Sequence, residues 1–169
     1  RALKNAHLDS ARTALSASGK MIVGVCSMAE TKETYRGVVL PAQCDHFGHL
    51  NVRYYAHFFD DGAFHLWSLF GFSLKAMQAA GYHTVVAHTA TNYIKELVAG
   101  DLLVIRGGFF RLGTKSCRYR QFMFHADNGE LHATQDGVEV FFDPESRTAL
   151  PIPAPVRAVI ADNLITVDD

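Results

Sequence analysis

The sequence predicts an α+β fold in which an antiparallel sheet wraps around one long helix. A strong helical pattern begins at Val52, and from Tyr82 to Asp143 the pattern changes to long β-rich segments separated by tight turns. One buried helix followed by a meander of strands is typical of a sheet that packs one face against that helix. The chain has 169 residues and shows no internal repeat or linker. We therefore expect a single domain over residues 31–169, preceded by an N-terminal arm or extension over residues 1–30.

The composition is that of an ordinary globular protein, with 49% hydrophobic and 20% charged residues. A formal net charge of −1 argues against binding to nucleic acid or to an anionic membrane surface, because both need a basic excess. No apolar run approaches the ~20 residues of a membrane span, and the first residues lack a signal-peptide pattern. Three cysteines without a Cys-x-x-Cys pair favour a reducing compartment, so we expect a cytoplasmic protein.

The first third of the chain contains one predicted strand. Residues 1–20 show weak helical periodicity up to Leu15, and the state of residues 21–26 stays open. Thr34–Gln43 combines β-branched and aromatic residues, with Pro41 near its end, which predicts a strand. Asn51 then offers a good N-cap for the helix that follows.

The long helix has an apolar stripe at helical spacing, formed by Val52, Tyr55, Ala56, Phe59, Ala63, Leu66, Trp67 and Phe70. Tyr54, Phe58 and Phe64 add aromatic residues to its other side, so we expect burial over most of its circumference. Gly71 is a suitable stop, and Ser73–Ala80 reads as a second, short helix capped by Ser73.

Four strands are expected after these helices, at His83–Leu97, Leu102–Leu112, Ser116–His125 and Glu130–Asp143. The segment Asp127-Asn128-Gly129 predicts a hairpin between the last two. The pair Gly107-Gly108 indicates a bulge or a close approach of another chain segment. A final helix is expected over Val156–Asn163.

The segment from Cys44 to Gly62 places an acid just before a helix N-terminus. Such a terminus has free N–H groups and a partial positive charge of about half a unit. It therefore favours an ionised Asp45, while the first helix amides can stabilise an oxyanion. A carboxylate in this position can attack an acyl carbonyl or activate water. The alternative is a loop aspartate that only caps a turn.

The run Asp45-His46-Phe47-Gly48-His49-Leu50-Asn51, followed by Tyr55 and Phe59, resembles the D-x-x-G-H-x-N-x-x-x-Y-x-x-x-F signature of hotdog-fold thioesterases. It is similar in particular to the 4-hydroxybenzoyl-CoA thioesterase-like group, and the resemblance extends roughly from Thr34 to Arg157. This resemblance implies a hotdog fold, with a five- to six-stranded antiparallel sheet around the central helix. It also implies a homodimer or homotetramer with active sites at subunit interfaces, and hydrolysis of acyl-CoA without metal or cofactor.

The resemblance also implies roles for single residues. Asp45 corresponds to the nucleophile or general base, and the backbone amide of Val52 to the group that polarises the thioester carbonyl. Asp60-Asp61 stands where many relatives carry Glu-Glu, which shortens these side chains by one methylene.

Further candidates surround this centre. His49 could orient the substrate carbonyl or water, with a turn histidine as the alternative reading. Asn51 is most simply an N-cap and secondarily a group that positions water. Gly48 permits a sharp approach of the loop to the helix. Substrate-binding candidates on the helix are Tyr54, Tyr55, Phe58 and Asp60, with core packing or a dimer interface as the alternative for the aromatic residues.

A basic cluster offers a docking surface for the phosphates of CoA. Lys115, Arg118 and Arg120 are the candidates, and Arg118 and Arg120 share one face of a strand. A solvated strand face is the alternative. The histidines have no coherent metal-ligand spacing, so no metal site is expected. We expect Cys44, the last residue before Asp45, to be a buried thiol rather than a nucleophile.

Three other functions compete with acyl-CoA hydrolysis. Hydrolysis of acyl groups from acyl carrier protein would use the basic cluster for an acidic partner surface. A hydratase is disfavoured, because Gly100-Asp101 continues with Leu-Leu rather than with the residues of a hydratase signature. A non-catalytic acyl-CoA-binding protein is the third alternative.

Overall fold

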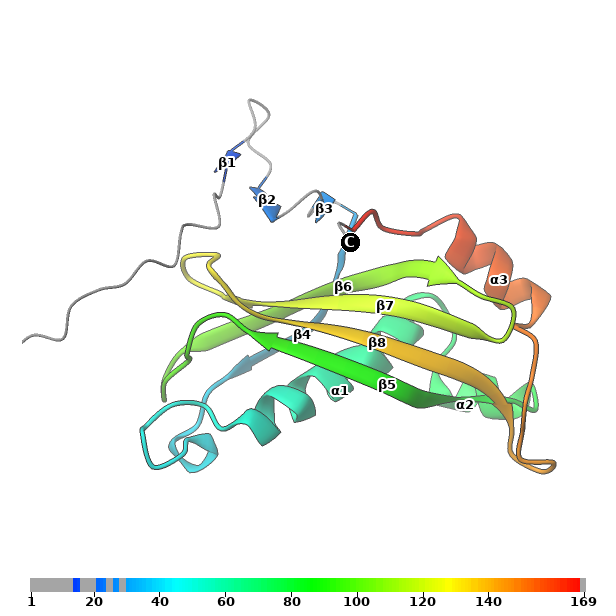
Figure 1. Cartoon of the computed structure of the whole chain (residues 1–169), viewed down its shortest axis with the longest axis horizontal. Coiled ribbons are helices and arrows are strands. Elements are labelled where there is room, and N and C mark those ends of the chain that lie inside the picture. Colours follow the sequence, from blue (N-terminus) through cyan, green and yellow to red (C-terminus); the bar gives the residue numbers. More distant parts are fainter. Residues whose placement is uncertain (1–13, 16–20, 24–25, 28–29, 168–169) are drawn as a thin grey trace, which may run out of the picture.

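The computed structural model describes residues 14–15, 21–23, 26–27 and 30–167. Its main feature is a six-stranded sheet in the order β4-β6-β7-β8-β5, with β9 paired to β8. The strands are β4 (Lys32–Val38), β5 (His83–Tyr93), β6 (Leu102–Leu112), β7 (Ser116–His125), β8 (Leu131–Asp143) and β9 (Thr148–Ala149). All pairings are antiparallel. Helix α1 (Val52–Leu69) lies along one face of the sheet (Figure 1), which confirms the predicted α+β hotdog fold.

Helix α1 starts and stops where local chemistry predicts. The Asn51 side chain caps it by accepting a hydrogen bond from the Arg53 N–H at 3.1 Å. Gly71, with φ of 86°, takes the left-handed conformation that ends many helices. Ser73 caps the short helix α2 (Leu74–Ala79) in the same way, through the Ala76 N–H at 3.3 Å.

The expected burial of α1 over most of its circumference is wrong at three large apolar residues. Val52, Phe64 and Leu69 are 59%, 56% and 55% exposed. Phe58, on the side of the helix away from the apolar stripe, is buried as expected, and Tyr35 of β4 stacks on its ring at 5.2 Å between centroids. The sheet therefore covers one more side of the helix than the apolar stripe indicates, and leaves another side open.

The N-terminal segments also differ from expectation. The first strand of the main sheet runs over Lys32–Val38 rather than Thr34–Gln43, and Pro41–Gln43 forms a 3-10 turn, η1. Proline lacks the N–H that a strand ladder needs, so the ladder stops before it. Ala14–Leu15, assigned to a weak helix, forms β1 instead. It pairs with β2 (Met21–Val23), which pairs with β3 (Cys26–Ser27). The rest of the expected helix lies outside the described residues.

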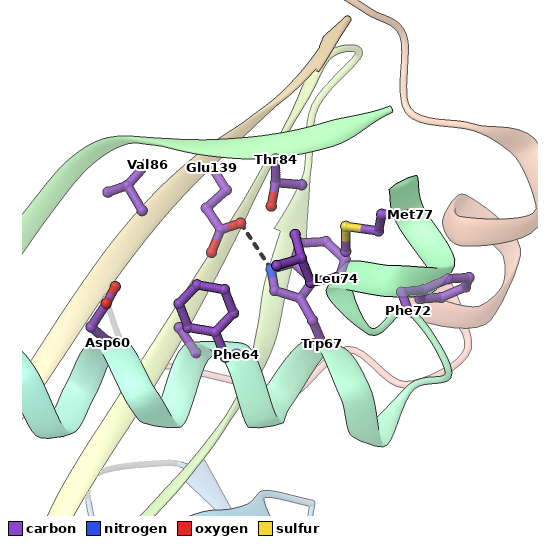
Figure 2. A pocket seen from close by; sticks show the side chains of 10 residues that line it. Asp60, Phe64, Trp67, Phe72, Leu74, Met77, Thr84, Val86 and Glu139 are labelled. Carbon is purple, nitrogen blue, oxygen red and sulfur yellow. Dashed lines mark hydrogen bonds between the residues drawn. The ribbon is translucent and has the colours of Figure 1, made fainter. Parts of the chain in front are cut away.

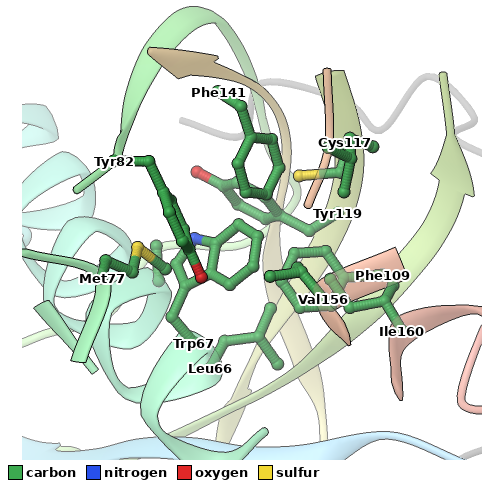
Figure 3. Close-up of a cluster of buried hydrophobic side chains, with 12 residues drawn as sticks. Leu66, Trp67, Met77, Tyr82, Phe109, Cys117, Tyr119, Phe141, Val156 and Ile160 are labelled. Atoms are coloured by element: carbon green, nitrogen blue, oxygen red, sulfur yellow. The ribbon is translucent and has the colours of Figure 1, made fainter. Parts of the chain in front are cut away.

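The core lies between the sheet and α1. Trp67 forms the centre of one cluster, with the ring of Phe109 4.6 Å away between centroids (Figure 3). The C-terminal helix α3 (Ala154–Ala161) adds Val156 and Ile160 to this cluster, close to the predicted Val156–Asn163. Among the described helices, none combines the length and apolarity that crossing a bilayer requires.

The glycine pair of β6 marks close approaches of other segments, as predicted. A Cβ on Gly107 would lie 2.8 Å from the Arg120 carbonyl oxygen, and one on Gly108 would lie 2.6 Å from the Cγ2 of Ile165. The irregularity in the pairing of β6 with β7 follows this glycine pair, between Phe109 and Arg111. Ile165 is held there by a hydrogen bond from its N–H to the Phe109 carbonyl at 2.8 Å.

Candidate active site

Asp45 lies in a tight loop that closes just before α1. Its N–H donates to the His49 carbonyl at 2.8 Å, and its Oδ1 accepts from the N–H groups of Phe47 at 2.8 Å and His49 at 3.3 Å. Gly48 supports this turn with φ of 83°, which an L-residue rarely adopts. The carboxylate is therefore held by its own loop, and it stays half-buried.

The same loop leaves one helix amide available. The Arg53 N–H is taken by the Asn51 side chain, and the Tyr54 N–H donates to the Asn51 carbonyl at 2.9 Å. Among the described residues, none accepts a hydrogen bond from the Val52 N–H. Such a free N–H at a helix N-terminus is suited to bind an oxyanion.

A cleft of about 300 Å³ joins Asp45, His49, Val52 and Tyr55 at the start of α1. Its remaining walls are Leu50, Tyr93, Ile94, Lys95 and Glu96. Tyr55 is buried, its hydroxyl lies 3.5 Å from the Lys95 carbonyl, and burial raises its pKa to about 12. The hydroxyl therefore stays neutral at physiological pH. Asn51 does not line this cleft, because its side chain is used in capping.

Sequence reasoning missed the wall formed by Tyr93, Lys95 and Glu96. The strand expected to continue to Leu97 ends at Tyr93, and the irregular residues after it turn toward the loop of Asp45. Several contacts hold this turn, among them a backbone hydrogen bond to the loop before α1 and an ion pair. The Leu50 N–H donates to the Leu97 carbonyl at 2.7 Å, and Lys95 pairs with Glu130 at 2.6 Å. The break after Tyr93 has no glycine or proline that could have signalled it.

Three helix candidates lie away from the cleft. Tyr54 is half-buried under the guanidinium of Arg53, 5.3 Å from its ring centroid. Phe58 is 2% exposed and belongs to the core. Asp60 lines two other cavities further along α1.

The basic candidates lie on the other face of the sheet. Cys117 and Tyr119 of β7 are buried in the cluster around Trp67, so the alternating residues Arg118 and Arg120 point outward. Both guanidinium groups lie over the ring of Phe110, at 5.3 and 5.5 Å from its centroid. Arg120 also pairs with Asp136 at 2.6 Å.

Lys115 is engaged as well, donating to the Ala149 carbonyl at 2.8 Å. Within one chain, Lys115, Arg118 and Arg120 therefore do not meet Asp45, since none of them lines its cleft.

Cys44 is half-buried rather than buried, and it follows η1. Among the described residues its ladder contact is an isolated bridge to Leu50, because the chain has already left β4. It does not line the cleft of Asp45. Over the described residues, no three side chains of His, Cys, Asp or Glu gather closely enough to hold a metal ion.

A second, smaller pocket of about 90 Å³ lies between α1, α2 and the end of β8 (Figure 2). It contains Glu139, which is 3% exposed and accepts a hydrogen bond from the Trp67 indole N–H at 2.8 Å. Burial raises the pKa of this carboxyl, and the nearby Asp60 raises it further. In the sequence, Glu139 is only an interruption of an apolar run, so its surroundings could not be inferred.

The comparisons with known proteins agree with this architecture. A sequence model described as the thioesterase-like superfamily matches residues 39–160, which include the loop of Asp45 and the whole of α1. No curated protein sequence matches the chain.

Several solved structures share the fold. A Staphylococcus aureus protein solved in complex with CoA has a TM-score of 0.73 at 20% identity, over 82% of this chain and 89% of that one. A 1,4-dihydroxy-2-naphthoyl-CoA thioesterase from Synechocystis has a TM-score of 0.67 at 18% identity, over 76% and 94%. A probable thioesterase from Escherichia coli has a TM-score of 0.68 at 22% identity, over 79% and 99%. At these identities the likeness shows the fold alone.

Proposed function

The chain belongs to the thioesterase-like superfamily, and from this premise we propose that it hydrolyses an acyl-CoA thioester to a free acid and CoA. One observation carries the proposal: the half-buried Asp45 lines the same cleft as Val52, whose N–H has no hydrogen-bond partner among the described residues. A nucleophile or base beside an oxyanion donor is what acyl transfer requires. Structures of the same fold include one in complex with CoA and that of a 1,4-dihydroxy-2-naphthoyl-CoA thioesterase, which supports the substrate class.

In the proposed mechanism the thioester carbonyl oxygen accepts a hydrogen bond from the Val52 N–H. The Asp45 carboxylate then attacks the carbonyl carbon, the C–S bond breaks, and CoA leaves as the thiolate. Water hydrolyses the resulting mixed anhydride and releases the acid. Alternatively Asp45 takes a proton from water as this water attacks the carbonyl carbon directly, after which the C–S bond breaks and CoA leaves as the thiolate. His49, at the edge of the same cleft, is proposed to orient the carbonyl or this water.

The test is a panel of acyl-CoA thioesters with thiol release as the readout. We expect Asp45→Asn to lower kcat by at least about 10²-fold, the order of effect seen when one stabilising or reacting group is removed. Unchanged turnover in Asp45→Asn would refute the mechanism. Binding of acyl-CoA without turnover in the native protein favours the non-catalytic alternative. Turnover of acyl carrier protein thioesters alone favours that other substrate.

We further propose that the protein is a homodimer, or a homotetramer built from two dimers, with the sites at the subunit interface. The support is β5, a strand of 11 residues at the edge of the described sheet, where β8 is its one neighbour among the described strands. Its Val85, Val86 and Tyr93 are 43%, 51% and 53% exposed. A long edge with exposed apolar side chains favours pairing with another chain. Tyr93 also lines the cleft of Asp45, so a second copy on β5 lies next to the site.

In such an assembly the outward basic residues are proposed to bind CoA phosphates at a neighbouring subunit's cleft. Arg118 is the best candidate, because it forms no ion pair with any described residue, whereas Arg120 is paired with Asp136. We expect Arg118→Ala to raise KM for acyl-CoA about tenfold, as for loss of a charged hydrogen bond of ~1.4 kcal/mol or more.

The control substrate for this test is a truncated thioester without the nucleotide, whose KM should not change. The control variant is Arg36→Ala, an exposed residue paired with Glu33 at 3.0 Å. An equal loss with both substrates would exclude a role of Arg118 in nucleotide binding.

A further inference from the structure

Glu139 is a buried acid that the proposed chemistry does not use. It projects from β8 into the pocket of about 90 Å³, whose walls include the rings of Phe64, Trp67 and Phe72 (Figure 2). Its hydrogen-bond donor is the neutral Trp67 indole, and the neutral Thr84 hydroxyl in the same pocket lowers its pKa as well. Among the described residues, no Lys, Arg or His forms an ion pair with it.

This arrangement costs folding free energy, so stability alone does not explain it. An acid removed from water without a cationic partner is unfavourable, and a neutral acceptor would satisfy the Trp67 N–H equally well. A carboxylate offers about four acceptor positions, and these neutral groups use only part of them. Glu139 therefore retains acceptor capacity toward the pocket, where Asp60 faces it from α1 (Figure 2).

The pocket is linked to the start of α1 by the side of the helix that the sheet leaves open. Asp60 and Val86 line both this pocket and a neighbouring groove of about 390 Å³. Arg53 and Ala56 line the other end of that groove, one residue along from the Val52 and Tyr55 of the Asp45 cleft. From Val52 to Asp60 the helix rises about 12 Å at 1.5 Å per residue. An extended chain at ~1.2 Å per bond covers this in roughly ten bonds.

We propose that this pocket receives the far end of the acyl chain, and that Glu139 selects chain ends carrying a hydrogen-bond donor, a hydroxyl or an ammonium group. The inference rests on the proposed acyl-CoA hydrolysis and names its substrate class. The pocket volume suits a small end group, since a water-sized group occupies about 30 Å³. A methyl end would leave the buried acceptor unmatched, and sites built to hydrogen-bond a substrate group discriminate strongly against analogues that lack it.

The experiment compares CoA thioesters of equal length, about ten bonds, that end in a methyl, a hydroxyl or an ammonium group. For the native protein we expect kcat/KM at least about tenfold higher for the better donor-ended substrate than for the methyl-ended one. Glu139→Met should reverse this preference, because an apolar pocket favours the methyl end. Glu145→Met, at an exposed acid in the turn after β8, is the matched control and should leave the ratio unchanged.

A conservative variant distinguishes a preference for hydroxyl-ended substrates from a preference for ammonium-ended substrates. Glu139→Gln keeps an oxygen for the Trp67 N–H but has no charge. A hydroxyl preference should survive it, and an ammonium preference should be lost. If Glu139→Met does not fold, Leu74→Trp tests the pocket from its exposed rim, where a larger ring should lower kcat/KM for these long substrates but not for acetyl-CoA.

Two failures remain distinguishable. If the native protein hydrolyses the panel without preference, or Glu139→Met keeps the native ratio, the inference about Glu139 is wrong while acyl-CoA hydrolysis stands. If no thioester is hydrolysed, the proposed activity is wrong. Calorimetry with the corresponding non-hydrolysable CoA thioethers then tests the pocket separately. Equal affinity for methyl- and donor-ended thioethers would refute the inference that Glu139 selects donor-ended chains.

Discussion

The side-chain amide of Gln121 donates a 2.7 Å hydrogen bond to the main-chain carbonyl of Phe59, in the middle of α1. Gln121 is fully buried on β7, and its Oε1 accepts from the Thr34 hydroxyl of β4 at 3.3 Å. One side chain thus joins the helix to two strands. Gly62 leaves room for it, because a Cβ at Gly62 would collide with Gln121 Oε1.

Replacing Gly62 by Ala should therefore destabilise the fold. Alanine is the better helix former by about 1 kcal/mol. We expect overpacking against Gln121 to outweigh this and to give a net loss of about 1–3 kcal/mol in the free energy of unfolding. Urea unfolding measures the difference. Ser68→Ala, on the exposed side of the same helix, should stay within about 0.5 kcal/mol of the native protein.

A double mutant identifies the cause. In a Gln121→Ala background the added methyl has no oxygen to displace, so the penalty of Gly62→Ala should shrink or change sign. Equal penalties in both backgrounds would mean that the collision with Gln121 is not the reason.

The two roles of Asp45 can be separated by comparing two substitutions. Asparagine keeps an Oδ1 that accepts from the N–H groups of Phe47 and His49, and alanine removes it. We expect both variants to lose hydrolysis, whereas only Asp45→Ala should lose about 1 kcal/mol of stability. Thermal unfolding and thiol release are the two measurements. An active Asp45→Ala would contradict the catalytic role, and a fully stable one would contradict the loop role.

The exposed edge of the sheet gives a prediction about assembly. Val85 on β5 is 43% exposed, and a lysine there places charge on the proposed contact with a second copy. We expect Val85→Lys to convert the dimer to a monomer, measured as a halved mass by light scattering on a sizing column. Val159→Lys, at a comparably exposed valine on α3, should keep the native mass. A native mass for Val85→Lys would exclude β5 as the interface.

Glu139 makes stability depend on pH. Burial and the neighbouring Asp60 raise its pKa in the folded protein above that of an ordinary glutamate. The folded state then holds a proton that the unfolded state releases. The stability this contributes is fully present below the unfolded pKa, and it is lost as pH rises through the folded pKa. A glutamine does not titrate, so Glu139→Gln should not lose stability between the unfolded and the folded pKa. We therefore expect the free energies of unfolding of the two proteins to converge or cross as pH rises across this range. Parallel curves would show that Glu139 does not titrate differently on folding.

Much of the fold follows from the periodicity of apolar residues and from the residues that form turns and helix caps. The bounds of β6 and β7 match the prediction. Gly113 follows β6 and the Asp127-Asn128-Gly129 turn follows β7, and such residues favour turns. The start of α1 follows from Asn51. Where the chain bends without such residues, as after Tyr93, the predicted strand runs too far.

The candidate site was predictable only where its parts are close in sequence. Asp45, His49 and Val52 lie within eight consecutive residues of the sequence, and the structure places all three at one cleft. Alternation along β7 correctly put Arg118 and Arg120 on one face, but it could not say that this face lies away from α1. The pocket of Glu139 depends on how β8 meets the helix, which no local pattern encodes.

Ile165, which fills the space over Gly108 and packs on Phe122 and Phe124, has a consequence for biosynthesis. Residue 165 follows every strand of the sheet in the sequence, so it leaves the ribosome after all of them. Until then the two phenylalanine rings on the outer face of the nascent sheet remain uncovered. Apolar surface exposed during folding promotes aggregation. A stop codon shortly before Ile165 should therefore yield insoluble protein, even though it removes no residue of the cleft of Asp45.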